Sequence, residues 1–118
     1  MTPVELKITE PGYMFDRINV TSSAGDRRVN TVTIDKLVSE GAILPPRCIK
    51  IDVEGAEVLV LSGAEAVLET YGPTIFLATH GHRVHQEACE LLKSLGYKLQ
   101  SIGGKSIEET DELIATAR

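Results

Sequence analysis

The order of the predicted elements in the second half of the chain constrains the fold most. Two short runs rich in apolar residues, "RCIKIDV" at 47–53 and "TIFLAT" at 74–79, alternate with helix-like segments at 55–71 and 84–95, and "YKLQSI" at 97–102 closes the series. Strands separated by helices are typical of right-handed crossovers in a parallel sheet. The sequence therefore predicts an α/β fold with a mostly parallel sheet flanked by helices.

The boundaries of these segments carry local signals. Ser62-Gly63 predicts a break inside the helical segment 55–71, and Pro73 ends that segment. Gly96 supplies a carboxyl cap to the amphipathic segment "VHQEACELLKSL" that precedes it. The run "TIFLAT" is almost wholly apolar, which predicts a strand covered on both faces.

The two ends of the chain give weaker patterns. "VELKIT" at 4–9 and "DRINVT" at 16–21 predict strands, and Thr33 is expected to cap a short helix. In the tail, Ser106 and Glu109 have capping-box spacing and favour a helix start, whereas "ELIATA" favours a last strand; both alternatives stay open. We expect one partial domain, with these parts: a lead-in of irregular or hairpin structure at 1–30, an α/β core at 31–102 and a tail at 103–118.

Composition excludes several function classes. The chain has 118 residues, enough for one domain, and its net charge of -5 argues against nucleic acid or an anionic membrane as a partner. No apolar run approaches the ~20 residues needed to span a bilayer, and "MTPVELKITE" does not resemble a signal peptide. We therefore expect a cytoplasmic location, with Cys48 and Cys89 as buried free thiols.

Polar side chains follow two of the predicted strands. Asp52 and Glu54 end the first, just before Gly55, and His80 follows the second. Because ligands of parallel sheets bind beyond the carboxyl ends of the strands, we expect these residues to face the same site. A purely structural alternative is that the two acids cap the next helix and complement its dipole. We expect Gly55 to permit a tight turn.

Histidines also gather in "HGHRVH", which contains His80, His82 and His85. Together with Asp52 they are candidate ligands of a divalent metal, and a small metal-dependent hydrolase is one alternative function. The other acid and histidine motifs that such hydrolases need are missing, so we assign no metal site. Outside that role, we expect the histidines to be exposed loop residues.

A longer pattern resembles a known family. The pieces "VNTVTIDKLV", "CIKIDVEGAEVLVLSGAEAVLETYGPTIFLATH" and "ELLKSLGYKL" look like the carboxyl-terminal half of an FkbM-type methyltransferase. The resemblance covers about 29–102, and "KIDVEGAE" at 50–57 is its most specific part. It implies a Rossmann-like class I fold, S-adenosylmethionine as cofactor and methyl transfer to a hydroxyl of a small molecule or sugar. It also implies that Asp52 and His80 are catalytic and that Asp52, Glu54 and Gly55 contact the cofactor.

The chain departs from the family pattern at its beginning. No glycine-rich turn follows an apolar strand, and the first strands of the family fold are not recognisable. Ala78 also stands where the family often has an acid. We therefore expect a half-fold that forms a homo-oligomer or needs a partner chain to supply the missing strands, and inactivity of the chain alone stays an open alternative. A non-catalytic assembly module or remnant is the remaining alternative. The strand 47–53 would have an edge that pairs with another chain, unless residues 4–21 cover it.

Overall fold

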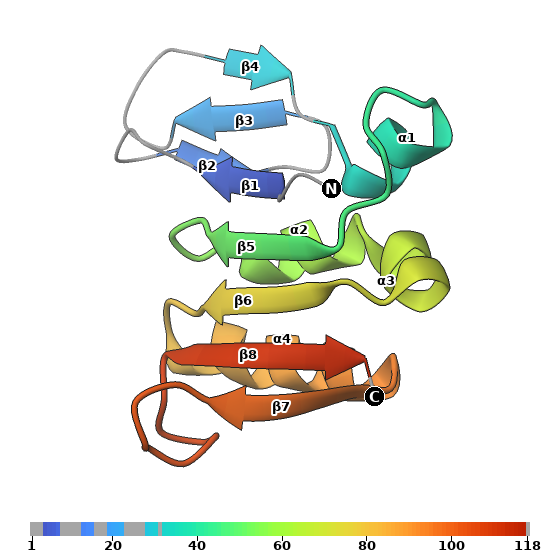
Figure 1. The fold of residues 1–118 in the computed structure, drawn as a ribbon. Helices are drawn as coiled ribbons and strands as arrows, with labels where there is room; N and C mark the ends of the chain where they lie inside the picture. The colour runs from blue at the N-terminus through green and yellow to red at the C-terminus, as the bar shows by residue number, and fades with distance from the viewer. Residues whose placement is uncertain (1–3, 8–12, 16–18, 23–27, 31, 118) are drawn as a thin grey trace.

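The computed structural model describes residues 4–7, 13–15, 19–22, 28–30 and 32–117. Figure 1 shows a sheet with helices packed behind it. The elements are, in chain order, β1 (Val4–Lys7), β2 (Tyr13–Phe15), β3 (Asn19–Ser22), β4 (Arg28–Asn30), α1 (Ile34–Ser39), β5 (Cys48–Asp52), α2 (Glu57–Ser62), α3 (Glu65–Tyr71), β6 (Thr74–Ala78), α4 (His82–Ser94), β7 (Tyr97–Ser101) and β8 (Glu112–Ala117).

The main sheet is mixed. Its strand order is β1-β5-β6-β8-β7. The β1–β5 and β5–β6 pairs are parallel, whereas the β6–β8 and β7–β8 pairs are antiparallel. The prediction of an α/β fold is confirmed, but that of a mostly parallel sheet is not. The reason is β8, which returns from β7 as an antiparallel neighbour and lies between β6 and β7 (Figure 1).

The tail resolves the alternative that the sequence left open. The backbone N–H of Thr110 donates to the carbonyl of Ser106, at 2.9 Å, and closes a single turn. The Ser106 hydroxyl donates to the Glu109 carboxylate at 2.9 Å, so the capping-box pair does meet, but no helix follows. The last strand, β8, is the correct alternative.

The amino-terminal segments form strands as well. β1 pairs in parallel with β5, whereas β2, β3 and β4 form a separate antiparallel sheet. The predicted strand at 16–21 corresponds to β3, which begins later; residues 8–12 and 16–18 lie outside the described residues. β1 covers one side of β5 and β6 covers the other, so the alternative that residues 4–21 cover the edge of this strand is the one observed.

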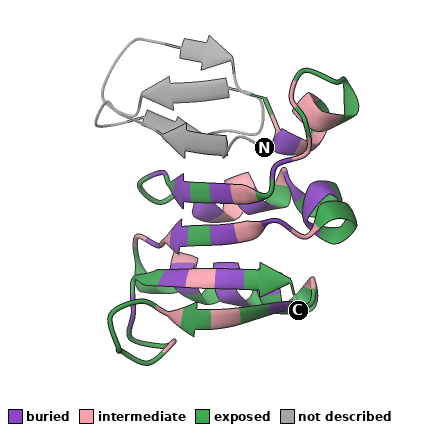
Figure 2. Ribbon diagram, in the orientation of Figure 1, coloured by how far each residue is buried: buried purple, intermediate pink, exposed green. Residues whose placement is uncertain are grey.

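The helices cover one face of the main sheet. Along β5 the burial alternates, with Ile49 and Ile51 buried and Lys50 and Asp52 exposed (Figure 2). Phe76 of β6 is 38% exposed. In the described part of the chain, no helix packs on that outer face (Figure 1). The prediction that β6 is covered on both faces is therefore wrong.

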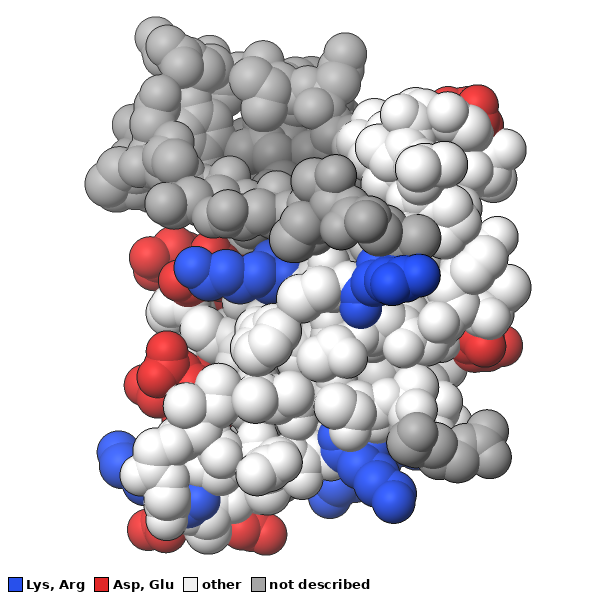
Figure 3. Space-filling view, viewed as in Figure 1, with Lys and Arg blue, Asp and Glu red and all other residues white. Residues whose placement is uncertain are grey.

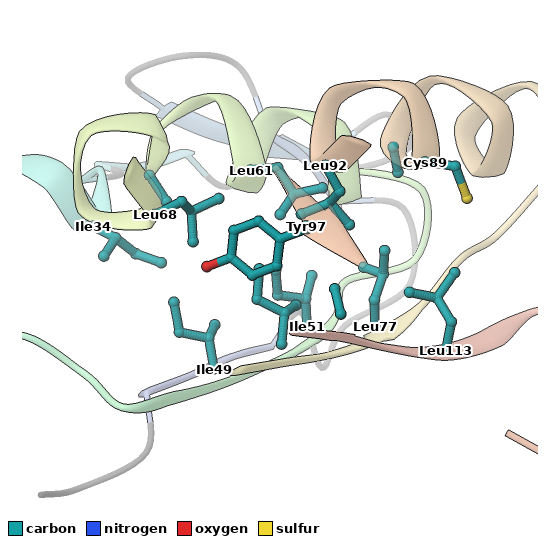
Figure 4. Packing of buried hydrophobic residues seen from close by; sticks show 14 of the residues in the cluster. Ile34, Ile49, Ile51, Leu61, Leu68, Leu77, Cys89, Leu92, Tyr97 and Leu113 are labelled. Carbon is teal, nitrogen blue, oxygen red and sulfur yellow. The ribbon is translucent and has the colours of Figure 1, made fainter. Parts of the chain in front are cut away.

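The core lies between this sheet and the helices, as Figure 4 shows. Apolar side chains of the sheet meet Leu61, Leu68 and Leu92 from the helices, and all three are buried. Tyr97 is also buried, and its hydroxyl donates to the Pro73 carbonyl at 2.7 Å. Burial raises the pKa of Tyr97 to about 12, since the phenolate would lose its hydration.

The predicted break after α2 is confirmed, and Asp35 stabilises it. The Asp35 carboxylate accepts hydrogen bonds from the backbone N–H groups of Ala66, at 3.1 Å, and Val67, at 2.9 Å, in the first turn of α3. Thr33 caps α1, as predicted, by accepting from the Lys36 N–H at 3.1 Å. The Asp35 side chain thus links α1, to which it belongs, to the first turn of α3.

Two further sequence predictions concern the thiols and the membrane. Cys48 and Cys89 are both free thiols, but only Cys89 is buried, while Cys48 is half-buried at the start of β5. Within the described ranges, no helix has the length and apolar character needed to cross a bilayer.

Candidate active site

The site begins with a turn in the left-handed backbone region. Glu54 has a φ of 56° and Gly55 a φ of 102°. Such angles are uncommon for a residue with a side chain, so Glu54 is held there by its surroundings, while glycine adopts them freely. This pair of residues turns the chain from β5 into α2 and confirms that Gly55 permits a tight turn.

Glu57 is the fixed point around which this turn is built. Its side chain is fully buried in the first turn of α2. Its Oε2 atom accepts hydrogen bonds from the backbone N–H groups of Val53, at 3.2 Å, and Gly55, at 3.0 Å. A buried carboxylate is tolerated only when such donors surround it, so the loop and the acid stabilise each other.

The same carboxylate holds His80, which follows β6. Glu57 Oε1 accepts from the His80 backbone N–H at 3.2 Å, and Glu57 Oε2 lies 3.0 Å from His80 Nδ1. The other ring nitrogen, Nε2, lies 3.4 Å from Asp52 Oδ1 and 3.9 Å from Glu54 Oε2. One histidine therefore connects three acids that come from the end of β5, the turn and α2.

Solvent reaches only part of this cluster. The side chains of Asp52 and Glu54 are 50% and 68% exposed, that of His80 is 36% exposed, and that of Glu57 is fully buried. Acidic side chains gather at the edge where β5 and β6 end (Figure 3). The Nδ1 side of the ring thus faces the buried carboxylate, and the Nε2 side faces the exposed acids.

These surroundings raise the pKa of His80 above 6.5. Burial acts in the opposite direction and lowers the pKa, because it disfavours the charged ring. The hydrogen bond and charge of Glu57, followed by the charges of Glu54 and Asp52, raise the pKa and outweigh burial. Protonated His80 is therefore stabilised by the acids around it.

The three residues that the sequence placed at strand ends lie together. Asp52, Glu54 and His80 meet at one edge of the sheet, as the strand order predicted. The capping role in the structural alternative for the acids is not observed, because the N-cap of α2 is Ala56 and no side chain caps this helix. Whether these residues catalyse a reaction or bind a cofactor stays a prediction.

Glu57 is the residue that sequence reasoning missed. Its signal is helical spacing: Glu57, Leu61, Ala64 and Leu68 recur at intervals of four and three residues, and all are buried. An acid in phase with an apolar stripe predicts a buried carboxylate, and such a group needs donors close by. The preceding glycine turn supplies two of them.

The other two histidines do not join the site. His82 and His85 belong to α4 and not to a loop, and His82 is exposed. His85 is buried, with Nδ1 2.8 Å from Thr79 Oγ1 and Nε2 2.6 Å from the Ile107 carbonyl. The expectation of exposed loop histidines is wrong for His85, which is buried in a helix, and for His82 it is right about exposure but wrong about the loop.

The separation of the histidines also removes the support for a metal site. Among the residues that the structure describes, no three His, Cys, Asp or Glu side chains are arranged to hold a metal ion. His80 and His85 bind partners in different parts of the fold, Glu57 and the Ile107 carbonyl. The arrangement gives no support to a metal-dependent hydrolase.

Comparison with known proteins places the chain in a family. The model of the methyltransferase FkbM domain matches residues 6–99, which is most of the chain. The chain therefore belongs to the FkbM methyltransferase domain family, and the resemblance drawn from "KIDVEGAE" is confirmed. Searches of curated proteins and of solved structures found no match.

Proposed function

We propose that this chain takes part in methyl transfer from S-adenosylmethionine to a hydroxyl group of a small molecule or sugar. The observation that carries the proposal is the position of His80 Nε2, which faces Asp52 and Glu54 at the carboxyl ends of two neighbouring parallel strands. Family membership supports a methyltransferase-like reaction. Together they support an active site with Asp52 and His80 as the catalytic residues.

The described residues fit the charge of this cofactor. S-adenosylmethionine carries a positive sulfonium and an ammonium group, and the carboxylates of Asp52 and Glu54 are exposed at the end of β5. A Cβ built on Gly55 would meet no atom within 4 Å, so the turn has free space beside it. Asp52, Glu54 and Gly55 would therefore hold the donor.

A bound donor would supply an electrophilic methyl group, with its methyl–sulfur bond breaking as the C–O bond forms. The chain's own residues orient the acceptor and move its proton. His80 Nε2 would take the single proton of the acceptor hydroxyl, and the Asp52 carboxylate beside Nε2 would stabilise the imidazolium that results. Positioning contributes most of the rate, because the donor's methyl group and the oxygen must be aligned.

The structure removes one reason to expect a partner chain, and one reason remains. β5 is paired on both sides, so this strand offers no edge to another chain. The glycine-rich turn of the family is not recognisable in the sequence. We propose that a second copy or a partner chain completes the donor site. The alternative of a non-catalytic assembly module is tested by the same experiment.

Calorimetric titration of the full chain with S-adenosylhomocysteine tests the function. We expect binding that Asp52→Ala abolishes and that Glu65→Ala retains, since Glu65 is an exposed acid at the start of α3. Unchanged binding by a folded Asp52→Ala variant would exclude the proposed donor contact. No binding by the folded wild-type chain would exclude a donor site completed by a second copy, and would leave the non-catalytic module or a donor site completed by a separate partner chain.

A further inference from the structure

The buried carboxylate of Glu57 has no role in the proposed function so far. It accepts four hydrogen bonds, from the backbone N–H groups of Val53, Gly55 and His80 and from the ring of His80. Any buried acceptor at this position could satisfy the three backbone N–H groups and hold the turn. The fourth contact, to Nδ1, acts on the ionisable ring of His80.

The chemistry of this contact determines which ring nitrogen carries the proton. A carboxylate only accepts hydrogen bonds, so the nitrogen 3.0 Å from Glu57 Oε2 must be the donor. In the neutral ring, a proton on Nδ1 leaves Nε2 as the acceptor. Nε2 is the nitrogen that faces Asp52 and the exposed side of the cluster.

We propose that Glu57 is a positioning residue that fixes His80 with its proton on Nδ1 and the free electron pair of Nε2 directed toward the acceptor. The proposal rests on the proposed function for the identity of that acceptor, a hydroxyl group. His80 then receives the hydroxyl proton at Nε2, and Glu57 stabilises the resulting imidazolium through Nδ1. The catalytic residue is His80, and Glu57 acts through it.

The charges around the ring favour the imidazolium that forms when Nε2 takes the proton, because both ring nitrogens then donate toward carboxylates. Three acids face it: Asp52 from β5, Glu54 from the turn and Glu57 from α2. On the β8 side, Glu112 is paired with Ala78, and the Asp111 carbonyl accepts from the Thr79 N–H. The nearest arginine in sequence, Arg83 in α4, is paired with Glu87 at 3.0 Å and does not neutralise the acids.

The tautomer of His80 is measured directly by nitrogen-15 NMR on the full chain. We expect the neutral ring to carry its proton on Nδ1. A neutral ring protonated on Nε2 would overturn the proposal whether or not the chain transfers methyl groups. An Nδ1 proton in a chain that fails to bind S-adenosylhomocysteine would support the Glu57–His80 arrangement and count against donor binding by this chain alone, so the two failures are distinguishable.

A variant adds a second readout that a purely structural role would not move. In Glu57→Gln we expect the midpoint of His80 protonation to fall by about 1 pH unit or more, because the nearest opposite charge is lost. The acid limb of the kcat/KM profile should fall with it. Glu65→Gln is the matched control and should leave both the midpoint and the acid limb unchanged.

A folded Glu57→Gln variant with the wild-type midpoint and tautomer would overturn the proposal. If the variant does not fold, the wild-type tautomer still decides.

Discussion

His80 and His85 follow the same strand, but their ring nitrogens contact different groups. His80 donates from Nδ1 to a buried carboxylate and directs Nε2 toward exposed acids. His85 is buried, with both nitrogens occupied by Thr79 and by the Ile107 carbonyl, which joins α4 to β6 and to the turn before β8. A histidine whose second nitrogen faces exposed acids and solvent can exchange a proton, whereas one that is buried with both nitrogens in contact stabilises the fold.

The difference comes from the helix phase. His85 shares one face of α4 with Ala88, Cys89 and Leu92, so the ring is carried into the core. Its Nε2 also lies 3.6 Å from the Cys89 sulfur, and burial raises the pKa of that thiol. His80 precedes the helix and lies at the sheet edge. Neighbouring histidines in one motif therefore serve different purposes.

We expect the largest effect from removing the Glu57 carboxylate, which contacts His80 and not His85. Glu57→Ala removes the acceptor of four hydrogen bonds and empties a fully buried position. We expect the free energy of unfolding to fall by about 3–5 kcal/mol, because the polar groups left behind lose their partner. Denaturant titration with Glu65→Ala as control measures it. A loss no larger than that of the control would contradict the role of Glu57.

The next effect tests the structural histidine. His85→Ala leaves the Thr79 hydroxyl and the Ile107 carbonyl without their partner and opens a cavity. We expect a loss of about 2–3 kcal/mol in the free energy of unfolding. The exposed His82→Ala variant should change it by less than ~0.5 kcal/mol. Thermal and denaturant unfolding measure both variants. Equal losses in the two would contradict a structural role of His85.

Asp35 provides an intermediate case, since its carboxylate accepts backbone N–H groups without binding a histidine. Asp35→Ala deprives Ala66 and Val67 of their acceptor at the start of α3. We expect a loss of about 1 kcal/mol, typical of a helix cap. Asp35→Asn should recover part of it, because the amide oxygen accepts one of the bonds. Denaturant unfolding of the three chains gives the comparison, and an unchanged Asp35→Ala variant would contradict the capping role.

The sequence predicted which residues lie at the site, but not the strand pairing or the side-chain contacts around them. Strand ends placed Asp52, Glu54 and His80 correctly, because a parallel crossover brings neighbouring strand ends to one edge. It did not reveal the insertion of β8 between β6 and β7, since pairing between strands depends on contacts that no local pattern encodes. It also missed the bond from Glu57 to His80, which joins residues of two different elements.

The smallest effect concerns the pH dependence of stability at His80. The pKa is lowered by burial but raised more strongly by the Glu57 hydrogen bond and by the three acids, so the folded value lies above 6.5. Folding therefore favours the protonated ring. Its contribution to stability is fully present below pH 6.5, the unfolded value, and is lost as the pH rises through the folded pKa.

The test is the difference in unfolding free energy between the wild type and His80→Gln, followed from acidic to mildly alkaline pH. We expect the advantage of the wild type to be greatest at the acidic end and to decline as the ring loses its proton. His82→Gln, which replaces an exposed histidine of α4, is the matched control and reports the effect of removing a ring outside the acidic cluster. A difference that instead grows with pH would mean that burial outweighs the acids, and His80 would then lose its distinction from a buried structural histidine.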